Sequence, residues 1–398
     1  MAREFAISIY LFVFRVLFSI FKLYPQKKKT VAVSSFGDNI AFTVNYLQNL
    51  TDEEIVILQE LNSKFKFDSN KHNIIPFDMK KHPVAYVKGI YHLATASTVL
   101  VDTYQGFLAS TNFRSGTTCI QLWHAAGALK QFGLEDPSNQ YRSKRALDRF
   151  KRVYSRFDYT VVGSEKMADT FKRSFGLTDN RILRTGIPRS DLLYDVNHRD
   201  EVYQSINQQF PEINGRKIIL YTPTFRDEHL SNYQLELDIK QMYQSLSDEY
   251  VLFIKLHPAV TGFITNDLFE DFVFDLSDYK DTNELLLITD ILISDYSSIP
   301  FEYAIMEKPM IFFAYDMQEY KITNGLIHDY EDHVPGPVVG STFEIVRIIQ
   351  EQDFSIEKVS AFRDSWNEYS NGNASRELAL FLTDTEEPKQ HKVLARAD

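Results

Sequence analysis

The sequence predicts an α/β protein with two doubly wound, Rossmann-like domains. The chain has 398 residues, of which 44% are hydrophobic, and a single core rarely exceeds roughly 250–300 residues. Short β-branched segments alternate with helical stretches, and this pattern starts again near residue 200. Alternating β and α units favour parallel sheets with helices on both faces.

The predicted strands run into small or turn-forming residues, as the strands of such sheets do. In the first half they lie at 30–36, 97–104, 117–127, 159–164 and 182–188. In the second half they lie at 217–227, 250–258, 272–277, 290–298 and 309–316.

These segments define the expected domain organisation. We expect an N-terminal domain over 30–197 and a C-terminal domain over 198–383, preceded by a helix and basic linker at 1–29. Residues 384–398 are short, polar and without periodicity, so a flexible tail is expected there.

Composition excludes several classes of protein. The net charge of −11 argues against a nucleic-acid partner. Cys119 is the single cysteine, so no internal disulfide can form and a reducing, cytoplasmic location is expected. Neither a metal ion nor a cofactor is expected, and nothing in the pattern indicates an oligomeric state.

The N-terminus carries a long apolar segment, from Phe5 to Phe21, before three lysines at 27–29. As a helix it would be about 26 Å long, short of the roughly 30 Å hydrocarbon core. Its polar residues form one narrow stripe: Glu4, Ser8, Arg15, Ser19 and Lys22. This pattern predicts an amphipathic helix in the plane of an anionic membrane surface, and the alternative is a buried helix of the fold. No small-residue cleavage site indicates a signal peptide.

A second basic segment follows the first few predicted strands. Five arginines alternate in spacing between three and four, which aligns them on one helical face: Arg142, Arg145, Arg149, Arg152 and Arg156. Such a stripe suits an anionic partner, and phosphates fit the planar fork of arginine; the alternative is a solvated face neutralised by acids. The docking face is expected to comprise Ala146, Phe150, Val153 and Phe157.

The stretch "QLWHAAGALKQFG" places His124 between Trp123 and a run of small residues that ends at Gly127. Ala and Gly fill little volume, so we expect the imidazole to be uncrowded and another molecule to be able to approach it closely. The alternative is a core histidine beneath Trp123.

Polar residues also gather where the strands of the second domain end, which is where doubly wound sheets bind ligands. The candidates are Thr222, Thr224, Arg226, His257, Asp295, Ser297, Ser298 and Glu302. A serine cap and a proline in the first helical turn favour an anion site. Any one of these residues could instead belong to an ordinary capped turn.

The runs "WHAAGALKQFG", "YTPTFRD", "KLHP" and "SDYSSIPFEYAIMEKP" resemble the CDP-glycerol glycerophosphotransferases of Gram-positive wall teichoic acid synthesis. The similarity extends from about Thr30 to about Leu380. Polymerising members typically have Trp-His-Gly and a proline in the first motif. The stretches "WHAAGALKQFGLED", "VVGSEKMADTFKRSFG" and "DSWNEYSNGNAS" resemble the primase branch instead.

The resemblance implies a glycosyltransferase B fold, with the acceptor on the N-terminal domain and CDP-glycerol on the C-terminal one. It maps the two essential histidines of the family onto His124 and His257. An attacking sugar hydroxyl needs a base, and neutral imidazole suits that role near pH 7, so we assign it to His124. His257 would hold the diphosphate together with Arg226, Ser297 and Ser298.

The remaining candidates complete the expected site. Glu302 and Asp295 would contact hydroxyls or orient these groups. The acceptor implied by the resemblance is an undecaprenyl-diphosphate disaccharide, which confines the enzyme to the cytoplasmic face of the membrane. The enzyme is then expected to add one glycerol phosphate and stop.

Three alternative functions stay open. They are a glycerol- or ribitol-phosphate polymerase of the same family, a sugar-nucleotide glycosyltransferase, and a catalytically idle membrane scaffold.

Overall fold

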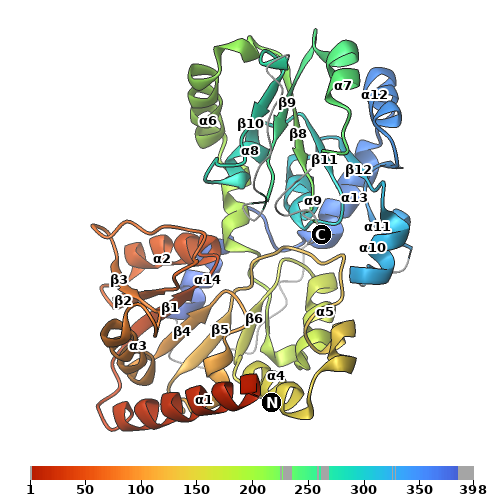
Figure 1. Cartoon of the computed structure of the whole chain (residues 1–398). Helices are drawn as coiled ribbons and strands as arrows, with labels where there is room; N and C mark the ends of the chain where they lie inside the picture. The colour runs from red at the N-terminus through yellow and green to blue at the C-terminus, as the bar shows by residue number, and fades with distance from the viewer. Residues whose placement is uncertain are drawn as a thin grey trace, which may run out of the picture.

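The computed structural model describes residues 2–224, 226, 235–257, 260, 269–324, 326–327 and 329–383. The predicted tail at 384–398 lies outside the described residues. Two parallel sheets stand one above the other, each in its own half of the chain (Figure 1). An α/β protein with parallel sheets was therefore predicted correctly.

The first sheet has the strand order β3-β2-β1-β4-β5-β6-β7, and its pairs are parallel. Because β1 and β4 are neighbours while the chain winds outward on both sides, the strand order reverses between them. The elements are α1 (Ala2–Phe21), β1 (Lys29–Ser34), α2 (Asp38–Leu50), β2 (Glu54–Gln59), β3 (Asn73–Pro76), α3 (Pro83–Thr95), β4 (Thr98–Val101), η1 (Gly106–Ser110), β5 (Thr118–Gln121), η2 (Gly133–Glu135), η3 (Pro137–Tyr141), α4 (Lys144–Tyr154), β6 (Tyr159–Val161), α5 (Glu165–Phe175), η4 (Asp179–Arg181), β7 (Ile182–Leu183) and η5 (Pro188–Tyr194).

The second sheet repeats this plan with the order β10-β9-β8-β11-β12-β13. Its switch point lies between β8 and β11, which pair in parallel. The elements are α6 (Val196–Gln209), η6 (Pro211–Ile213), β8 (Lys217–Thr222), α7 (Ile239–Leu246), β9 (Tyr250–Ile254), β10 (Val273–Asp275), α8 (Thr282–Ile288), β11 (Ile291–Ser294), α9 (Ile299–Tyr303), η9 (Ala304–Met306), β12 (Met310–Phe313), α10 (Met317–Asn324), α11 (Tyr330–His333), β13 (Val338–Val339), α12 (Thr342–Glu351), α13 (Ile356–Trp366) and α14 (Ala374–Thr383).

Three strands were missed by the sequence analysis, namely β2, β3 and β13. The segment "EIVILQ" of β2 has the β-branched composition of a buried strand, so its signal was present. By contrast, β3 ends in a proline and β13 has two residues. Such edge strands carry little local signal and are specified by their neighbours.

The N-terminal helix α1 lies along the outer end of the N-terminal domain, away from the second sheet (Figure 1). Phe14 and Phe18 are each 1% exposed. Phe14 stacks on Phe107 and meets Tyr86 edge-on, and Phe18 meets Phe113 edge-on. One face of α1 is thus part of the core, as the alternative reading expected. The opposite face remains exposed and apolar, through Phe5, Ile9, Phe12, Val13, Val16 and Ile20.

The lysines that follow α1 differ from the expectation of a basic linker. Lys29 is fully buried at the start of β1, where its Nζ lies 3.1 Å from His92 Nδ1. Burial lowers the pKa of Lys29 to about 8. Lys28 forms an ion pair with Glu53 at 2.9 Å. Lys29 therefore cannot face a membrane, because its side chain belongs to the interior of the domain.

The end of the described chain returns to the N-terminal domain. Helix α14 packs against α2 and η5 (Figure 1). The backbone N–H groups of Ala374 and Ser375 donate to the Asp191 carboxylate at 2.9 and 2.8 Å. The expected C-terminal range 198–383 therefore ends in a helix that packs on the other domain. Helix α14 therefore connects the two halves of the chain in addition to the linker at η5.

Candidate functional site

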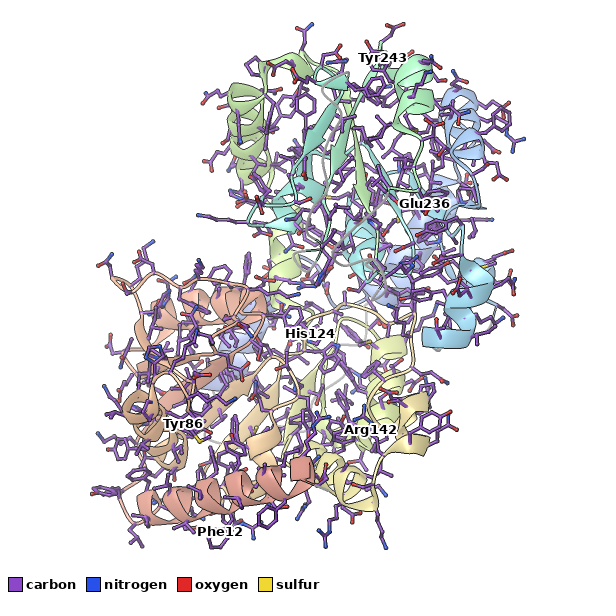
Figure 2. The ribbon with its side chains drawn as sticks, viewed as in Figure 1. Phe12, Tyr86, His124, Arg142, Glu236 and Tyr243 are labelled. Carbon is purple, nitrogen blue, oxygen red and sulfur yellow. The ribbon has the colours of Figure 1, made fainter. Side chains whose placement is uncertain are left out.

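The candidate base His124 directly follows β5, near the junction between the two domains (Figure 2). Its Nδ1 lies 3.0 Å from the backbone carbonyl of Asp102. A carbonyl oxygen can only accept, so Nδ1 carries the proton and Nε2 keeps its lone pair. Burial lowers the pKa of His124 to about 4, and the charges of Arg189 and Lys64 also lower it. His124 is therefore neutral near pH 7, as general base catalysis requires.

Asp102 positions His124 in two ways. Besides its carbonyl contact, its carboxylate accepts the backbone N–H groups of three consecutive residues, Ser35, Phe36 and Gly37, at 3.0, 2.9 and 2.7 Å. Phe36 in turn stacks on the imidazole of His124, with ring centroids 4.1 Å apart and planes 9° apart. Burial raises the pKa of the Asp102 carboxyl to about 7, and the three backbone N–H groups oppose that rise. Asp102, at the β1/β4 switch point, thus contacts His124 through its carbonyl and holds the turn that carries Phe36 through its carboxylate.

Trp123 and Gly127, both predicted to shape an acceptor pocket, have other surroundings. The indole of Trp123 packs within its own domain against Phe132, Phe171 and Phe175. A Cβ added to Gly127 would lie 2.2 Å from a ring carbon of Phe301. Gly127 therefore admits Phe301 of the C-terminal domain, and a sugar cannot occupy the space at this position.

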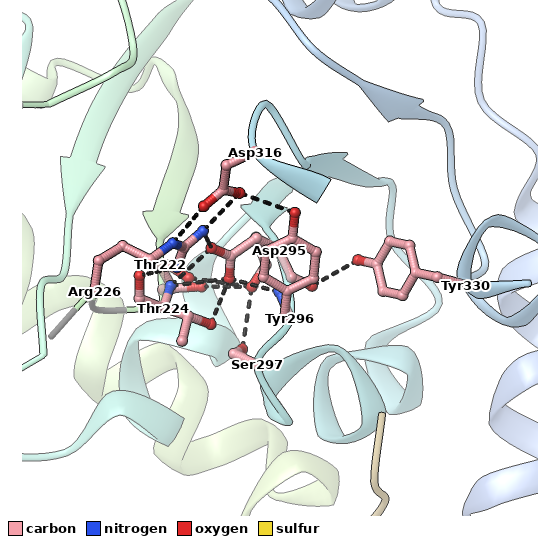
Figure 3. Close-up of polar contacts among 9 residues, drawn as sticks. Thr222, Thr224, Arg226, Asp295, Tyr296, Ser297, Asp316 and Tyr330 are labelled. Carbon is pink, nitrogen blue, oxygen red and sulfur yellow. Dashed lines mark hydrogen bonds and ion pairs between the residues drawn. The ribbon is translucent and has the colours of Figure 1, made fainter. Parts of the chain in front are cut away.

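On the C-terminal domain, Asp295 occupies the position that corresponds to Asp102. It follows β11, is 2% exposed, and accepts the backbone N–H of Thr224 at 2.9 Å and its hydroxyl at 2.6 Å. Arg226 lies between Asp295 at 3.2 Å and Asp316 at 2.6 Å (Figure 3). Tyr330 donates to the carbonyl of Asp295 at 2.8 Å. Asp295 therefore orients Thr224 and Arg226, which was one of its two expected roles.

The serine turn after β11 is built differently from the expectation. Ser297 accepts the backbone N–H of Ile299 at 3.2 Å, whereas Ser298 makes no side-chain cap. Helix α9 has five residues before it tightens into a 3₁₀ turn, so its dipole is weak. Thr222 is buried, and its hydroxyl donates to Ser294 within the sheet at 3.2 Å. Thr222 is thus a structural residue, and Ser297 and Ser298 keep partly exposed side chains.

Glu302, predicted to contact ligand hydroxyls, is 2% exposed and pairs with Arg189 of η5. Arg189 Nε donates to Glu302 Oε1 at 2.8 Å, and its Nη1 lies 3.4 Å from Asp38 Oδ2. The backbone N–H of Arg189 also donates to Asn39 Oδ1 at 3.0 Å. Because Glu302 belongs to α9 and Asp38 begins α2, this buried group joins the two domains, and the contacts of Arg189 with Glu302 are made to Oε1.

His257 follows β9 and its side chain is partly exposed. Burial lowers the pKa of His257, and the charges of Lys64 and Lys255 lower it further. The same Lys64 ammonium also lowers the pKa of His124. The two histidines expected at the site are thus on opposite domains but share one charged neighbour.

The basic helix α4 is shorter than the predicted arginine stripe. It spans Lys144–Tyr154, so Arg142 and Arg156 lie beyond its ends. The expected docking face is confirmed: Ala146, Val153 and Phe157 are buried, and Phe150 is partly buried. Arg149 binds Glu4 of α1 at 3.0 Å, whereas Arg145 and Arg152 remain exposed.

A hollow of about 500 Å³ lies between α1 and α4. Its lining combines four cationic and two acidic residues with a serine and a leucine: Glu4, Ser8, Leu11, Arg145, Asp148, Arg149, Lys151 and Arg152. Its rim adjoins the exposed apolar face of α1, on which Phe12 points away from the domain (Figure 2). Arg3–Phe21 is long and apolar enough to cross a membrane by length and composition, with a mean hydropathy of 1.9.

Sequence reasoning missed Phe36, Lys64, Asp102, Arg189 and Asp316. Asp102 had a signal, because "VLVDT" ends a strand in aspartate as "LISDY" does at Asp295. The other residues had none, since their role depends on partners far away in the chain. No group of histidine, cysteine or acidic residues suited to a metal ion occurs within the described part of the chain.

A family model and curated relatives named for teichoic acid synthesis both match this chain. The model of the CDP-glycerol:poly(glycerophosphate) glycerophosphotransferase family matches residues 16–383. The teichoic acid glycerol-phosphate primase of Bacillus subtilis (strain 168) is 37% identical over 358 residues, which are 90% of this chain and 92% of that protein. The teichoic acid poly(ribitol-phosphate) polymerase of Bacillus spizizenii (strain ATCC 23059 / NRRL B-14472 / W23) is 31% identical over 399 residues, 96% of this chain and 61% of that protein.

Among solved structures, the wall teichoic acid polymerase TagF superimposes with a TM-score of 0.79 and 22% identity. The match covers 96% of this chain and 98% of that chain. This likeness shows the fold.

Proposed function

The chain belongs to the CDP-glycerol:poly(glycerophosphate) glycerophosphotransferase family, and from this premise we propose that it is a teichoic acid glycerol-phosphate primase. It transfers one glycerol phosphate from CDP-glycerol to a sugar hydroxyl of a lipid-linked disaccharide and releases CMP. The observation that carries the proposal is His124, a neutral imidazole whose Nδ1 is held by a carbonyl, so that Nε2 is ready to accept a proton.

The proposed reaction is a displacement at the β-phosphorus. Nε2 of His124 takes the proton of the acceptor hydroxyl while its oxygen bonds to the β-phosphorus. The bond from that phosphorus to the bridging oxygen breaks, and CMP leaves with the bonding electrons. Positioning and electrostatic stabilisation provide most of the catalysis in phosphoryl transfer. The two doubly wound sheets support a glycosyltransferase B arrangement, with the acceptor on the His124 side.

CDP-glycerol is assigned to the C-terminal domain at the β8/β11 switch point, where doubly wound folds bind ligands. Thr224, Arg226, Ser297 and Ser298 have partly exposed side chains at this edge, and His257 follows the neighbouring strand. Asp295 and Asp316 hold Arg226 in place. In this proposal Asp295 and Glu302 position the site and do not contact the donor.

A peripheral location on the cytoplasmic face of the membrane completes the proposal. The exposed apolar face of α1 is suited to the interface, and Arg145 and Arg152 beside it are suited to anionic head groups. Contacts of Phe14 and Phe18 hold α1 along the domain, which supports a helix in the membrane plane. The hollow between α1 and α4 could receive a lipid phosphate or the acceptor diphosphate.

Nucleotide release tests the donor assignment. Purified enzyme with a short-chain lipid-linked disaccharide should release CMP from CDP-glycerol and nothing from UDP-sugars, and His124→Ala should abolish the release. UDP release from a UDP-sugar would indicate a glycosyltransferase instead. The absence of turnover with every donor would favour the scaffold alternative.

A further inference from the structure

Lys64 lies in the loop that follows β2, and two backbone hydrogen bonds fix this loop against the turn after β1. The N–H of Lys64 donates to the Ser35 carbonyl at 3.1 Å, and the N–H of Phe65 donates to the Phe36 carbonyl at 2.8 Å. Gly37 permits the close approach, since it has a φ of 99° and an added Cβ would lie 2.5 Å from Phe65 Cβ. The backbone position of Lys64 is therefore set by the same turn that Asp102 holds.

The ammonium of Lys64 lies one aromatic ring away from His124. Its Nζ is 4.1 Å from the centroid of the Phe36 ring, a distance typical of a cation–π contact. The imidazole of His124 stacks on the same ring at 4.1 Å. Two groups at contact distance cannot share one face, so Lys64 and His124 lie on opposite faces of Phe36. Phe36 thus acts as a spacer between the base and a positive charge.

The charges around Lys64 leave it without a neutralising contact. Asp38 attracts the ammonium and Arg189 repels it, but the Asp38 carboxylate already pairs with Arg189. Within the described ranges no carboxylate lies at ion-pair distance from Lys64 Nζ. Lys64 is exposed, and partial burial lowers its pKa. An accessible ammonium without a carboxylate partner is free to bind an anion.

On the donor side, by contrast, the charge of the candidate cation is already neutralised by carboxylates. Arg226, the cation expected at the diphosphate, already lies between the carboxylates of Asp295 and Asp316. His257 is neutral near pH 7, because its pKa lies below the ordinary value. Neither residue therefore adds net positive charge to a donor diphosphate. The charge of Lys64 lowers the pKa of both His124 and His257.

We propose that Lys64 binds the non-bridging oxygens of the phosphoryl group during transfer, so that the N-terminal domain supplies a cation as well as the base. The inference rests on the proposed function. His124 takes the acceptor proton, the acceptor oxygen bonds to the β-phosphorus, and CMP leaves with the electrons of the broken bond. Lys64 stays protonated throughout and stabilises the negative charge on the equatorial oxygens, as a compact ammonium does at phosphates.

Three variants test the role of this charge. Lys64→Met keeps the aliphatic stem on Phe36 but removes the charge, Lys64→Arg keeps the charge, and Lys66→Met is a matched control at an exposed lysine of the same loop. Lys64→Met should lower kcat roughly 100-fold or more, the typical effect of removing one transition-state donor. Lys64→Arg should recover most of the activity, and Lys66→Met should match wild type. The Kd for CDP-glycerol should change far less than kcat.

The pH profile gives a readout that a structural role would not move. The positive charge of Lys64 helps to lower the pKa of His124, together with burial and Arg189, while the bond to the Asp102 carbonyl raises it. Removing the charge should therefore move the acid limb of kcat/KM to higher pH in Lys64→Met but not in Lys64→Arg. A folded Lys64→Met with wild-type kcat and an unmoved acid limb would overturn the inference. A wild-type enzyme that releases no CMP would overturn the proposed function itself.

Discussion

At the scale of single residues, the pKa of His124 determines when the enzyme can work. The base is active only when neutral, so activity is lost as the pH falls through its pKa. Burial lowers that pKa to about 4. We therefore expect kcat/KM to stay nearly constant from about pH 7 down to about pH 5.

The matching measurement is a pH profile of kcat/KM with a thermal melt at each pH. The unfolded chain protonates His124 near the ordinary value of about 6.5. Between that value and about 4 the unfolded state binds more protons, so the folded state loses stability as the pH falls. The thermal melts report the loss of stability, and the kinetics of enzyme that is still folded report the protonation of His124. An acid limb near pH 6.5 in folded enzyme would contradict the assignment of His124.

Gly127 provides a second prediction at this scale. An added Cβ would lie 2.2 Å from the Phe301 ring, so Gly127→Ala should force the domains apart locally and lower Tm and activity together. Overpacking of this kind typically costs about 1–3 kcal/mol. Gly340→Ala is the control, since nothing lies within 4 Å of its added Cβ. Phe301→Leu should partly restore Gly127→Ala, and a Gly127→Ala enzyme with unchanged Tm would refute the packing role.

At the scale of elements, local sequence indicates most of the strands but few of the distant residues that contact their side chains. β-Branched runs predict β1, β4 and β5, because a strand that is buried on both faces is rich in such residues. Helix α4 begins at Lys144 because Ser143 caps its N-terminus, and Arg142 therefore lies outside the helix. The partner of Glu302 could not be predicted, since Arg189 reaches it from a distant turn. Sequence pattern thus indicated the region of the candidate site, and the structure shows which contacts its individual residues make.

Helix α1 has two apolar faces, and this changes how membrane binding should be tested. Deleting α1 would expose the core around Phe14 and Phe18. Replacing Phe5 and Phe12 by serine changes only the outer face, where these side chains are 69% and 66% exposed. Burying one Phe contributes about 1.5–3 kcal/mol, so each substitution should weaken binding by about tenfold or more.

Sedimentation with vesicles that contain anionic lipid measures this effect. Phe343→Ser is the matched control, because Phe343 lies on α12 of the other domain and is 62% exposed. The control should bind as wild type does, and the CMP release with a soluble short-chain acceptor should be unchanged in all variants. Wild-type vesicle binding by the Phe5→Ser/Phe12→Ser variant would exclude α1 as the membrane contact.

At the scale of the whole molecule, the domains are connected by helix α14, which packs on the N-terminal domain, and by the buried group of Arg189, Glu302 and Asp38, among other contacts. Breaking a buried ion pair by removing one partner costs about 3–5 kcal/mol, because the other charge remains buried. Glu302→Gln should therefore lower Tm by several degrees. Glu307→Gln is the control, since its pair with Arg363 is at the surface and such pairs contribute about 0–1 kcal/mol.

Thermal unfolding followed by fluorescence distinguishes these outcomes. Glu302→Gln is expected to lose stability and catalytic rate, while the Glu307→Gln control keeps both. If both variants melted at the wild-type temperature, the Arg189 group would not be holding the domains together.

The central claim is that this chain transfers a single glycerol phosphate from CDP-glycerol to a lipid-linked disaccharide. Gly127 no longer supports it, because Phe301 fills the space beside that residue, so the claim rests on the family and on the similarity to primases. Mass analysis of a synthetic lipid-linked disaccharide after long incubation with excess CDP-glycerol is the most direct test. We expect one added glycerol phosphate per acceptor and one CMP per product. A ladder of products with many glycerol phosphates would contradict it and identify a polymerase.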